Sequence, residues 1–188
     1  MEHNSTGIPH GKLGMWIFLS SEIMLFGAFI SAYIVLRMGS PNFGVPPEAI
    51  MGRPLATINT FVLITSSVTM VLALAAIQRD NTKQFAMFMV LTSLLGMTFL
   101  GIKGYEYHHK ISEGLTISSG LFGSFYFTLT GLHALHMIGG LIFNAYVLIN
   151  GLRGKFNSRH YERVEYAGLY WHFVDLVWVI LFPVFYLI

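Results

Sequence analysis

The chain has 188 residues, of which 54% are hydrophobic and only 11% charged, and its formal net charge is +2. The charge content is less than half of the roughly 25% that is usual for a soluble domain, so the composition indicates a membrane protein. The small net charge argues against nucleic acid as a partner. The absence of cysteine excludes disulfides, thiolate-bound metals and covalently attached c-type haem.

Five apolar stretches are long enough to span a bilayer, which takes about 20 residues of helix. They cover residues 13–36, 55–77, 85–102, 121–149 and 167–188. Polar segments or segments rich in glycine and proline separate them. We therefore predict an all-α fold, in which residues 1–188 form a single transmembrane domain of five transmembrane helices.

The basic residues lie at the ends of the apolar stretches, and their distribution predicts the orientation. The larger group falls on the side of the N-terminus: Lys12, Arg79, Lys83, Arg153, Lys155, Arg159 and Arg163. The smaller group falls on the opposite side: Arg37, Arg53, Lys103 and Lys110. Because cytoplasmic segments carry the excess of Lys and Arg, we expect the N-terminus inside and the C-terminus outside, with these residues as anchors at the membrane edge.

Few ionisable residues lie within the five predicted spans. The first span contains Glu22, the fourth contains His133 and His136, and the fifth contains His172 and Asp175. At 1.5 Å per residue, all five fall in one layer roughly 8–14 Å from the inner surface. A charge in hydrocarbon costs several kcal/mol unless it faces a protein partner or water. We therefore predict one polar cluster that links the first, fourth and fifth helices.

Two interpretations of this cluster stay open at the level of sequence. The histidines favour hydrogen bonds between helices. A haem held by His172 together with His133 or His136 is an alternative. A carboxylate-bound metal site is disfavoured, because the spans contain too few carboxylates to serve as its ligands. Glu22 is either a protonated structural residue or a group that handles protons or lines a lipid cleft. We expect the adjacent His108 and His109 at a solvated membrane edge.

Several longer motifs occur along the chain in a characteristic order. They are Ser20-Ser21-Glu22 with Leu25-Phe26, Asn59-Thr60 with Ser66-Ser67-Val68-Thr69, residues 101–107 with Tyr105-Glu106-Tyr107, residues 123–136, and residues 170–178. In these motifs the chain resembles subunit III of the haem-copper terminal oxidases. The resemblance covers nearly the whole sequence.

The resemblance implies an accessory subunit of an aerobic respiratory oxidase in the bacterial cytoplasmic membrane. Such a chain carries no haem, copper or other metal of its own, since these belong to partner subunits. It packs beside subunit I, which reduces oxygen to water and pumps protons, in a complex with subunit II. Phospholipid is a further expected partner, and the basic residues Arg153 and Lys155 could bind its headgroups.

The resemblance also implies roles for individual residues. Glu22 corresponds to the family's membrane-buried glutamate, which is associated with proton uptake into subunit I and with bound phospholipid. The other signature positions, His133, His136, His172 and Asp175, serve the fold and the lipid cleft. The mitochondrial form has seven helices, so the five predicted here resemble the shorter bacterial form.

Position 22 bears on which electron donor the oxidase uses. Glutamate at position 22, where the quinol-oxidising branch has aspartate, favours cytochrome c as the donor. A quinol oxidase subunit or an accessory chain of a nitric oxide reductase is the alternative within the family. A haem-binding membrane cytochrome would show a Soret band from the isolated chain, and a proton channel would show proton flux that depends on Glu22. Neither of these explains the full set of motifs.

Overall fold

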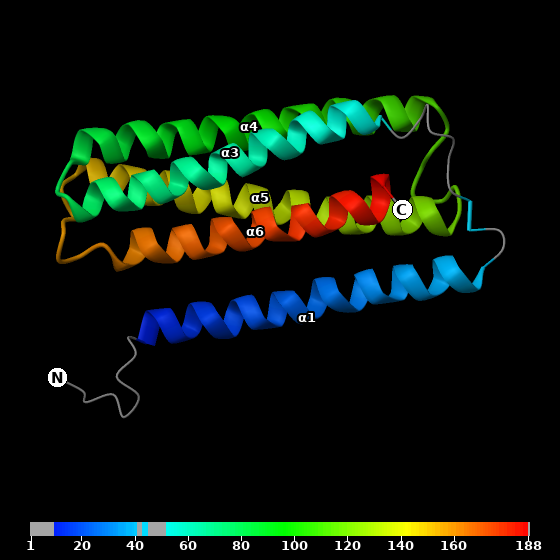
Figure 1. Cartoon of the computed structure of the whole chain (residues 1–188), viewed down its shortest axis with the longest axis horizontal. Helices are drawn as coiled ribbons and strands as arrows, with labels where there is room; N and C mark the ends of the chain where they lie inside the picture. The colour runs from blue at the N-terminus through cyan, green and yellow to red at the C-terminus, as the bar shows by residue number, and fades with distance from the viewer. Residues whose placement is uncertain (1–9, 41–42, 45–51, 188) are drawn as a thin grey trace.

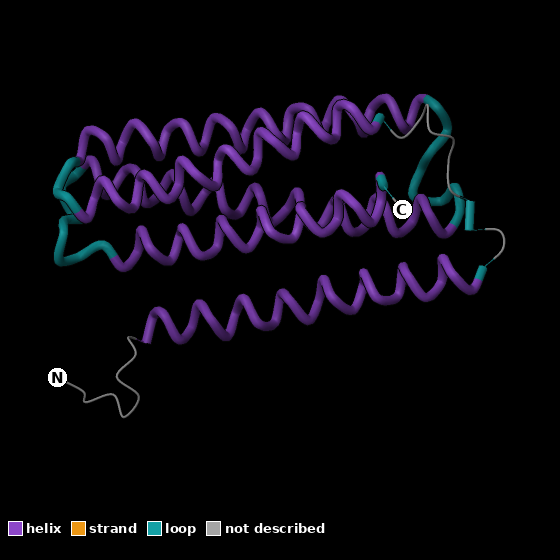
Figure 2. The backbone as a smooth tube through the Cα atoms, viewed as in Figure 1, coloured by secondary structure: helices purple, strands orange, loops and turns teal. Residues whose placement is uncertain are grey.

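The computed structural model describes residues 10–40, 43–44 and 52–187, which form a bundle of long helices (Figure 1). The helices are α1 (His10–Gly39), α3 (Arg53–Gln78), α4 (Thr82–Ser112), α5 (Leu121–Leu152) and α6 (Glu162–Tyr186). Figure 2 draws no strand in the described ranges, where the β structure is limited to an isolated bridge between Asn157 and His160. All five helices are long and apolar enough to cross a membrane. The predicted all-helical fold with five transmembrane helices is confirmed.

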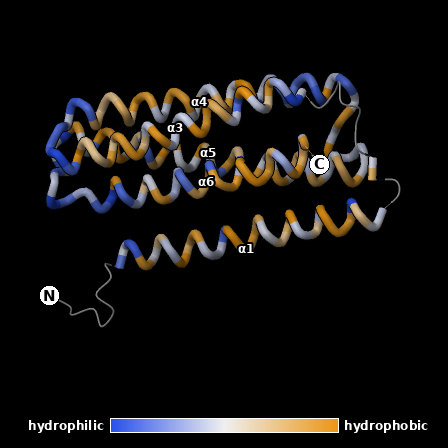
Figure 3. Tube along the Cα trace, viewed as in Figure 1, coloured by the Kyte–Doolittle hydropathy of each residue, from blue (hydrophilic) through white to orange (hydrophobic). Residues whose placement is uncertain are grey.

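Four of the helices form a closed bundle, and α1 lies outside it. Helix α3 packs against α4 and α6, and α5 packs against the same two helices, whereas α1 contacts α5 and α6 (Figure 1). On α1 the buried residues are Leu19, Phe26 and Tyr33, which recur every seven residues and so form one narrow stripe. Much of α1 is hydrophobic (Figure 3). Many of its hydrophobic side chains are exposed, including Trp16 and Met24. These other faces of α1 must therefore meet lipid or another membrane protein.

Short sequence signals set the ends of the helices. Gly52, which has a φ of +64°, precedes α3, and Pro54 occupies the first turn of that helix. The side chain of Asn81 accepts a hydrogen bond of 3.1 Å from the amide of Gln84 and so caps α4. Gly114, with a φ of +85°, follows the last turn of α4. These signals make the connection from α3 to α4 a tight turn and fix the end of α4.

Helix α4 is longer than predicted, because it continues past Ile102 to Ser112. The charged residues at its end do not terminate it, since their side chains turn into the bundle, where they are paired. With 31 residues in α4 and 32 in α5, each helix measures over 45 Å at about 1.5 Å per residue, well beyond a hydrocarbon core of about 30 Å. Their ends therefore reach the headgroup region. Helix α6 also begins earlier than predicted, at Glu162.

The centre of the bundle is organised around Trp171 of α6. A Cβ added to Gly96 of α4 would lie 2.7 Å from the indole, and one added to Gly140 of α5 would lie 3.0 Å from it, so two glycines make room for the ring. The indole Nε1 donates a hydrogen bond of 3.1 Å to the hydroxyl of Ser66 on α3. One side chain thus joins all four helices of the closed bundle and fixes their spacing.

Candidate functional site

Glu22 on α1 is paired with His136 on α5. The Oε2 of Glu22 lies 3.0 Å from Nε2 of His136, and each side chain is 17% exposed. The Phe26 ring packs edge-on against the imidazole, one turn further along α1. From α6, the hydroxyl of Tyr170 donates a hydrogen bond of 3.0 Å to the backbone carbonyl of His136. The pair therefore lies where α1 meets α5 and α6, partly open to the outside of the bundle.

The hydrogen bonds of His136 determine how this pair can hold a proton. Its Nδ1 lies 2.8 Å from the carbonyl oxygen of Leu132, and because a carbonyl only accepts, Nδ1 must carry a hydrogen. The contact between Nε2 and Glu22 then needs one further proton. That proton resides either on the carboxyl, which gives a neutral pair, or on the imidazole, which gives an ion pair. In this geometry the pair therefore shares a single proton, which either atom can carry.

His172 and Asp175 lie on another face of α6 and do not join this pair. The Nδ1 of His172 is 2.6 Å from the hydroxyl of Ser67 on α3. Asp175 is 5% exposed, and the hydroxyl of Ser67 is the donor beside its carboxyl, which has no other hydrogen-bond partner within the described residues. Both side chains line a pocket between α3 and α6 together with Ser67. This second polar site belongs to α3 and α6, not to α1.

His133 forms no polar contact with the other candidate residues. It is 1% exposed, and neither ring nitrogen has a hydrogen-bond partner in the described parts of the chain. Its ring packs between Phe99, at a centroid distance of 5.6 Å, and Trp178, at 5.2 Å. The prediction of one cluster containing all five residues is therefore wrong. Equal depth along the helices did not imply a shared face. The structure pairs Glu22 with His136, places His172 and Asp175 in a separate pocket, and leaves His133 apart from both.

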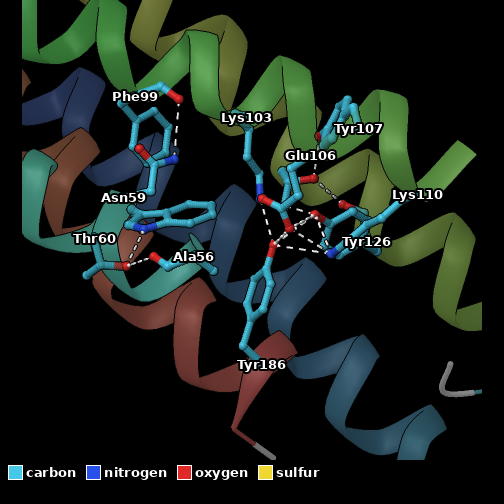
Figure 4. A network of polar contacts seen from close by, with 12 residues as sticks. Ala56, Asn59, Thr60, Phe99, Lys103, Glu106, Tyr107, Lys110, Tyr126 and Tyr186 are labelled. Atoms are coloured by element: carbon cyan, nitrogen blue, oxygen red, sulfur yellow. Dashed lines mark hydrogen bonds and ion pairs between the residues drawn. The ribbon is translucent and has the colours of Figure 1, made fainter. Parts of the chain in front are cut away.

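A buried ion network that was not predicted lies at the end of the bundle where α4 ends (Figure 4). Glu106 lies at its centre, with its carboxylate 2.9 Å from Nζ of Lys103 and 2.7 Å from Nζ of Lys110. The hydroxyls of Tyr126 on α5 and Tyr186 on α6 also donate to this carboxylate, the first over 3.0 Å. The exposed fractions of Lys103, Glu106 and Lys110 are only 3%, 3% and 1%.

This network corrects one prediction. Lys103 and Lys110 are not anchors at the membrane edge but buried ion-pair partners, in the part of α4 that extends beyond the predicted third span. The ammonium of Lys103 also lies 4.5 Å from the centre of the Trp178 ring, a cation–π contact. A signal for the network was present, since positions i, i+3 and i+7 share one face of a helix. The network joins α4, α5 and α6 near their ends.

Comparison with known proteins decides the family. The sequence profile of the family described as cytochrome c oxidase subunit III matches residues 2–188. The chain belongs to the cytochrome c oxidase subunit III family. It is therefore a multi-pass membrane protein and a member of a haem-copper oxidase complex, a cytochrome c oxidase or a quinol oxidase.

Relatives with assigned names cover most of the chain. The chain is 37% identical over 176 residues to "cytochrome c oxidase subunit 3" of Alkalihalophilus pseudofirmus, which covers 93% of this chain and 85% of the relative. It is 33% identical over 177 residues to "probable quinol oxidase subunit 3" of Staphylococcus saprophyticus, which covers 94% of this chain and 88% of the relative. The protein of the same name from Staphylococcus aureus strain USA300 is 34% identical, with the same coverage.

In this subunit III chain, the predicted headgroup residues lie at the end where α5 connects to α6. Arg153 and Lys155 are exposed. Lys155 lines a pocket of about 260 Å³ together with Arg163, His160 and Glu162, whereas Arg153 does not. At the opposite end of the bundle, His108 and His109 are exposed in the last turns of α4. The pocket near Lys155 thus combines two basic side chains with the acidic Glu162.

Proposed function

We propose that this subunit III is an accessory subunit that packs beside subunit I of a proton-pumping oxidase and binds no haem or copper itself. The arrangement of the histidines supports this proposal. His133 is enclosed by the rings of Phe99 and Trp178, and His172 is turned toward Ser67 on α3. The two imidazoles thus do not face each other across a space for a haem. Haems and copper would be held by subunits I and II.

We further propose that the pair of Glu22 and His136 supplies protons to subunit I. The observation that carries this proposal is the single transferable proton between Oε2 and Nε2, at a position that is partly exposed on the outside of the bundle. The neighbouring faces of α1 are apolar and unpartnered within the described chain, which suits contact with a membrane subunit or with phospholipid. A proton taken up at this site could then be passed to a partner without crossing the bundle.

The orientation with the N-terminus inside agrees with the arrangement of the helices. The beginning of α1, the turn from α3 to α4 and the connection from α5 to α6 all lie at one end of the bundle (Figure 1). This end carries the larger group of basic residues. At the other end, Lys103 and Lys110 are buried against Glu106. This unequal distribution of basic residues favours the end where α1 begins as the cytoplasmic one, in a bacterial cytoplasmic membrane.

For the electron donor we propose cytochrome c. Glutamate at position 22 favours this donor, and the 37% identity to a cytochrome c oxidase subunit exceeds the 33% and 34% to quinol oxidase subunits. The test is oxygen consumption by the purified oxidase with reduced cytochrome c or with a quinol as the only donor. Faster turnover with cytochrome c supports the proposal, and activity with the quinol alone refutes it.

Substitution of Glu22 tests the proton role. In Glu22→Gln the side chain keeps its size and can still hydrogen-bond to His136, but it cannot carry the transferable proton. We expect the first turnovers of the oxidase to be normal, and sustained turnover or the ratio of protons pumped to electrons to fall. Ser21→Ala is the matched control, because the Ser21 hydroxyl donates only to the carbonyl of Phe18 in its own helix. An unchanged time course and proton ratio in Glu22→Gln would refute the role.

A further inference from the structure

A pocket of about 290 Å³ opens on the outer surface of the bundle between α3 and α6. The residues that line it are Ile64, Ser67, His172, Asp175, Leu176 and Val179, and we call it the Asp175 pocket. It lies on a different face of α6 from Phe173, which packs against Phe26 of α1. The pocket is therefore separate from the site formed by Glu22 and His136.

The polar groups of the Asp175 pocket are incompletely satisfied by this chain. Asp175 is 5% exposed, and among the described residues the donor beside its carboxyl is the hydroxyl of Ser67, whose single hydrogen can serve at most one of the two oxygens. The hydroxyl of Ser67 is engaged with Nδ1 of His172, and Nε2 of that ring makes no hydrogen bond within the described chain. Buried carboxyl oxygens in proteins normally have hydrogen-bond partners, because leaving them without one is costly. The arrangement calls for a donor from outside the chain.

The depth of the pocket restricts the source of that donor. Asp175 lies near the middle of α6 (Glu162–Tyr186), and Ser67 lies near the middle of α3 (Arg53–Gln78). At 1.5 Å per residue both are roughly 16–21 Å from either end of their helix. Lipid headgroups and soluble ligands stay at the membrane surface, and acyl chains offer no hydrogen-bond donor. At this depth a side chain of another transmembrane segment can supply the donor.

We propose that the Asp175 pocket is the docking site for a transmembrane helix of a partner subunit, which inserts a hydrogen-bond-donating side chain toward the Asp175 carboxyl. The rim suits such a helix, since Ile64, Leu176 and Val179 are 44%, 57% and 45% exposed and all apolar. An apolar rim around a buried polar centre is the pattern that directs helix association in membranes. The inference rests on the proposed function, because the partner is a subunit of the same oxidase.

Photo-crosslinking in the intact oxidase tests this docking site. A photoreactive amino acid is placed at Leu176 or Val179 on the pocket rim, and at Ile142 on α5 as a control, which is 67% exposed. After irradiation in membranes, mass spectrometry identifies what is attached. We expect a second transmembrane subunit to be crosslinked from the rim positions. Attachment of lipid alone, or of a second copy of this chain, would overturn the proposal, as would crosslinking of the partner from Ile142 only.

Substitution of Asp175 provides the second test. We expect Asp175→Leu to reduce at least tenfold the amount of partner subunit retained through detergent purification, while Asp175→Asn, which keeps an acceptor oxygen, retains it. The isolated Asp175→Leu chain should melt at or above the wild-type temperature, which separates a docking defect from misfolding. Unchanged retention in Asp175→Leu refutes the docking site alone. Failure of the wild-type chain to retain any haem-containing subunit would instead refute the proposed function.

Discussion

Glu106→Gln would remove the negative charge shared by Lys103 and Lys110 while keeping the size of the side chain. Two ammonium groups would then stay buried without a counter-charge. At the observed separations of 2.9 and 2.7 Å, each ion pair has a Coulomb energy of about 6 kcal/mol at an effective dielectric constant of about 20. Much of this energy only offsets desolvation, and breaking one buried pair costs about 3–5 kcal/mol in practice. We expect the free energy of unfolding to fall by at least this amount.

The assay is thermal unfolding of the purified chain in detergent, followed by tryptophan fluorescence. Trp178 is a suitable reporter, because it is fully buried and lies against the ammonium of Lys103. With a shift of about 2–4 °C per kcal/mol, Glu106→Gln should lower the melting temperature by roughly 6–20 °C.

A matched control separates the loss of charge balance from the loss of packing. The triple variant Lys103→Met, Glu106→Leu and Lys110→Met replaces the whole ion network by apolar groups of similar size. Tyr126 and Tyr186, whose hydroxyls lie 2.8 Å apart, can still bond to each other. This variant should melt close to or above the wild-type temperature, because an apolar replacement removes the desolvation cost as well. A wild-type melting temperature for Glu106→Gln, or a triple variant as unstable as the single one, would refute this reasoning.

Three further predictions concern other parts of the bundle. Trp171→Ala should cost about 3–5 kcal/mol of unfolding free energy in the same melting assay, because it leaves a cavity where four helices meet, and a loss below about 1 kcal/mol would contradict that position. His133→Leu should leave stability unchanged or raise it, since the imidazole has no partner among the described residues, and a loss above about 2 kcal/mol would contradict that expectation. The Ser158 hydroxyl and amide bond to Asp80, the amide over 2.7 Å, and lower the pKa of that carboxyl. This contact is therefore fully present above the ordinary aspartate pKa near 4, and it is lost as the pH falls through the lower pKa that Asp80 has in the folded protein. The Ser158 amide should keep its hydrogen-exchange protection to about pH 4 and lose it only in more acidic solution.

The transmembrane helices could be predicted well, because spanning a bilayer is a property of local sequence. An apolar stretch of the required length needs no knowledge of its neighbours, and the structure places a helix over each predicted stretch. The end of α4 was mispredicted because Lys103 and Lys110 were interpreted as anchors at the membrane edge, and Glu106 only as part of a longer motif. Considered together, their spacing along one face of a helix indicates mutual pairing.

The candidate site could be predicted only in part, because depth along a helix is one coordinate of three. Counting residues placed Glu22 and His136 at similar depths, and they do contact each other. His172 contacts Ser67 instead, because its side of α6 faces α3. Which helix lies beside which face is decided by packing, such as that of Trp171 against two glycines, and the apolar pattern of a membrane helix carries little of that information.

The most direct test of the account is purification of this subunit, tagged and expressed in its native membrane, with a reduced-minus-oxidised visible spectrum and mass spectrometry of the material that accompanies it. We expect haem bands together with a large polytopic haem-copper subunit, and no haem band once this chain is separated from that partner. A haem spectrum from the separated chain would contradict the account and favour a membrane cytochrome.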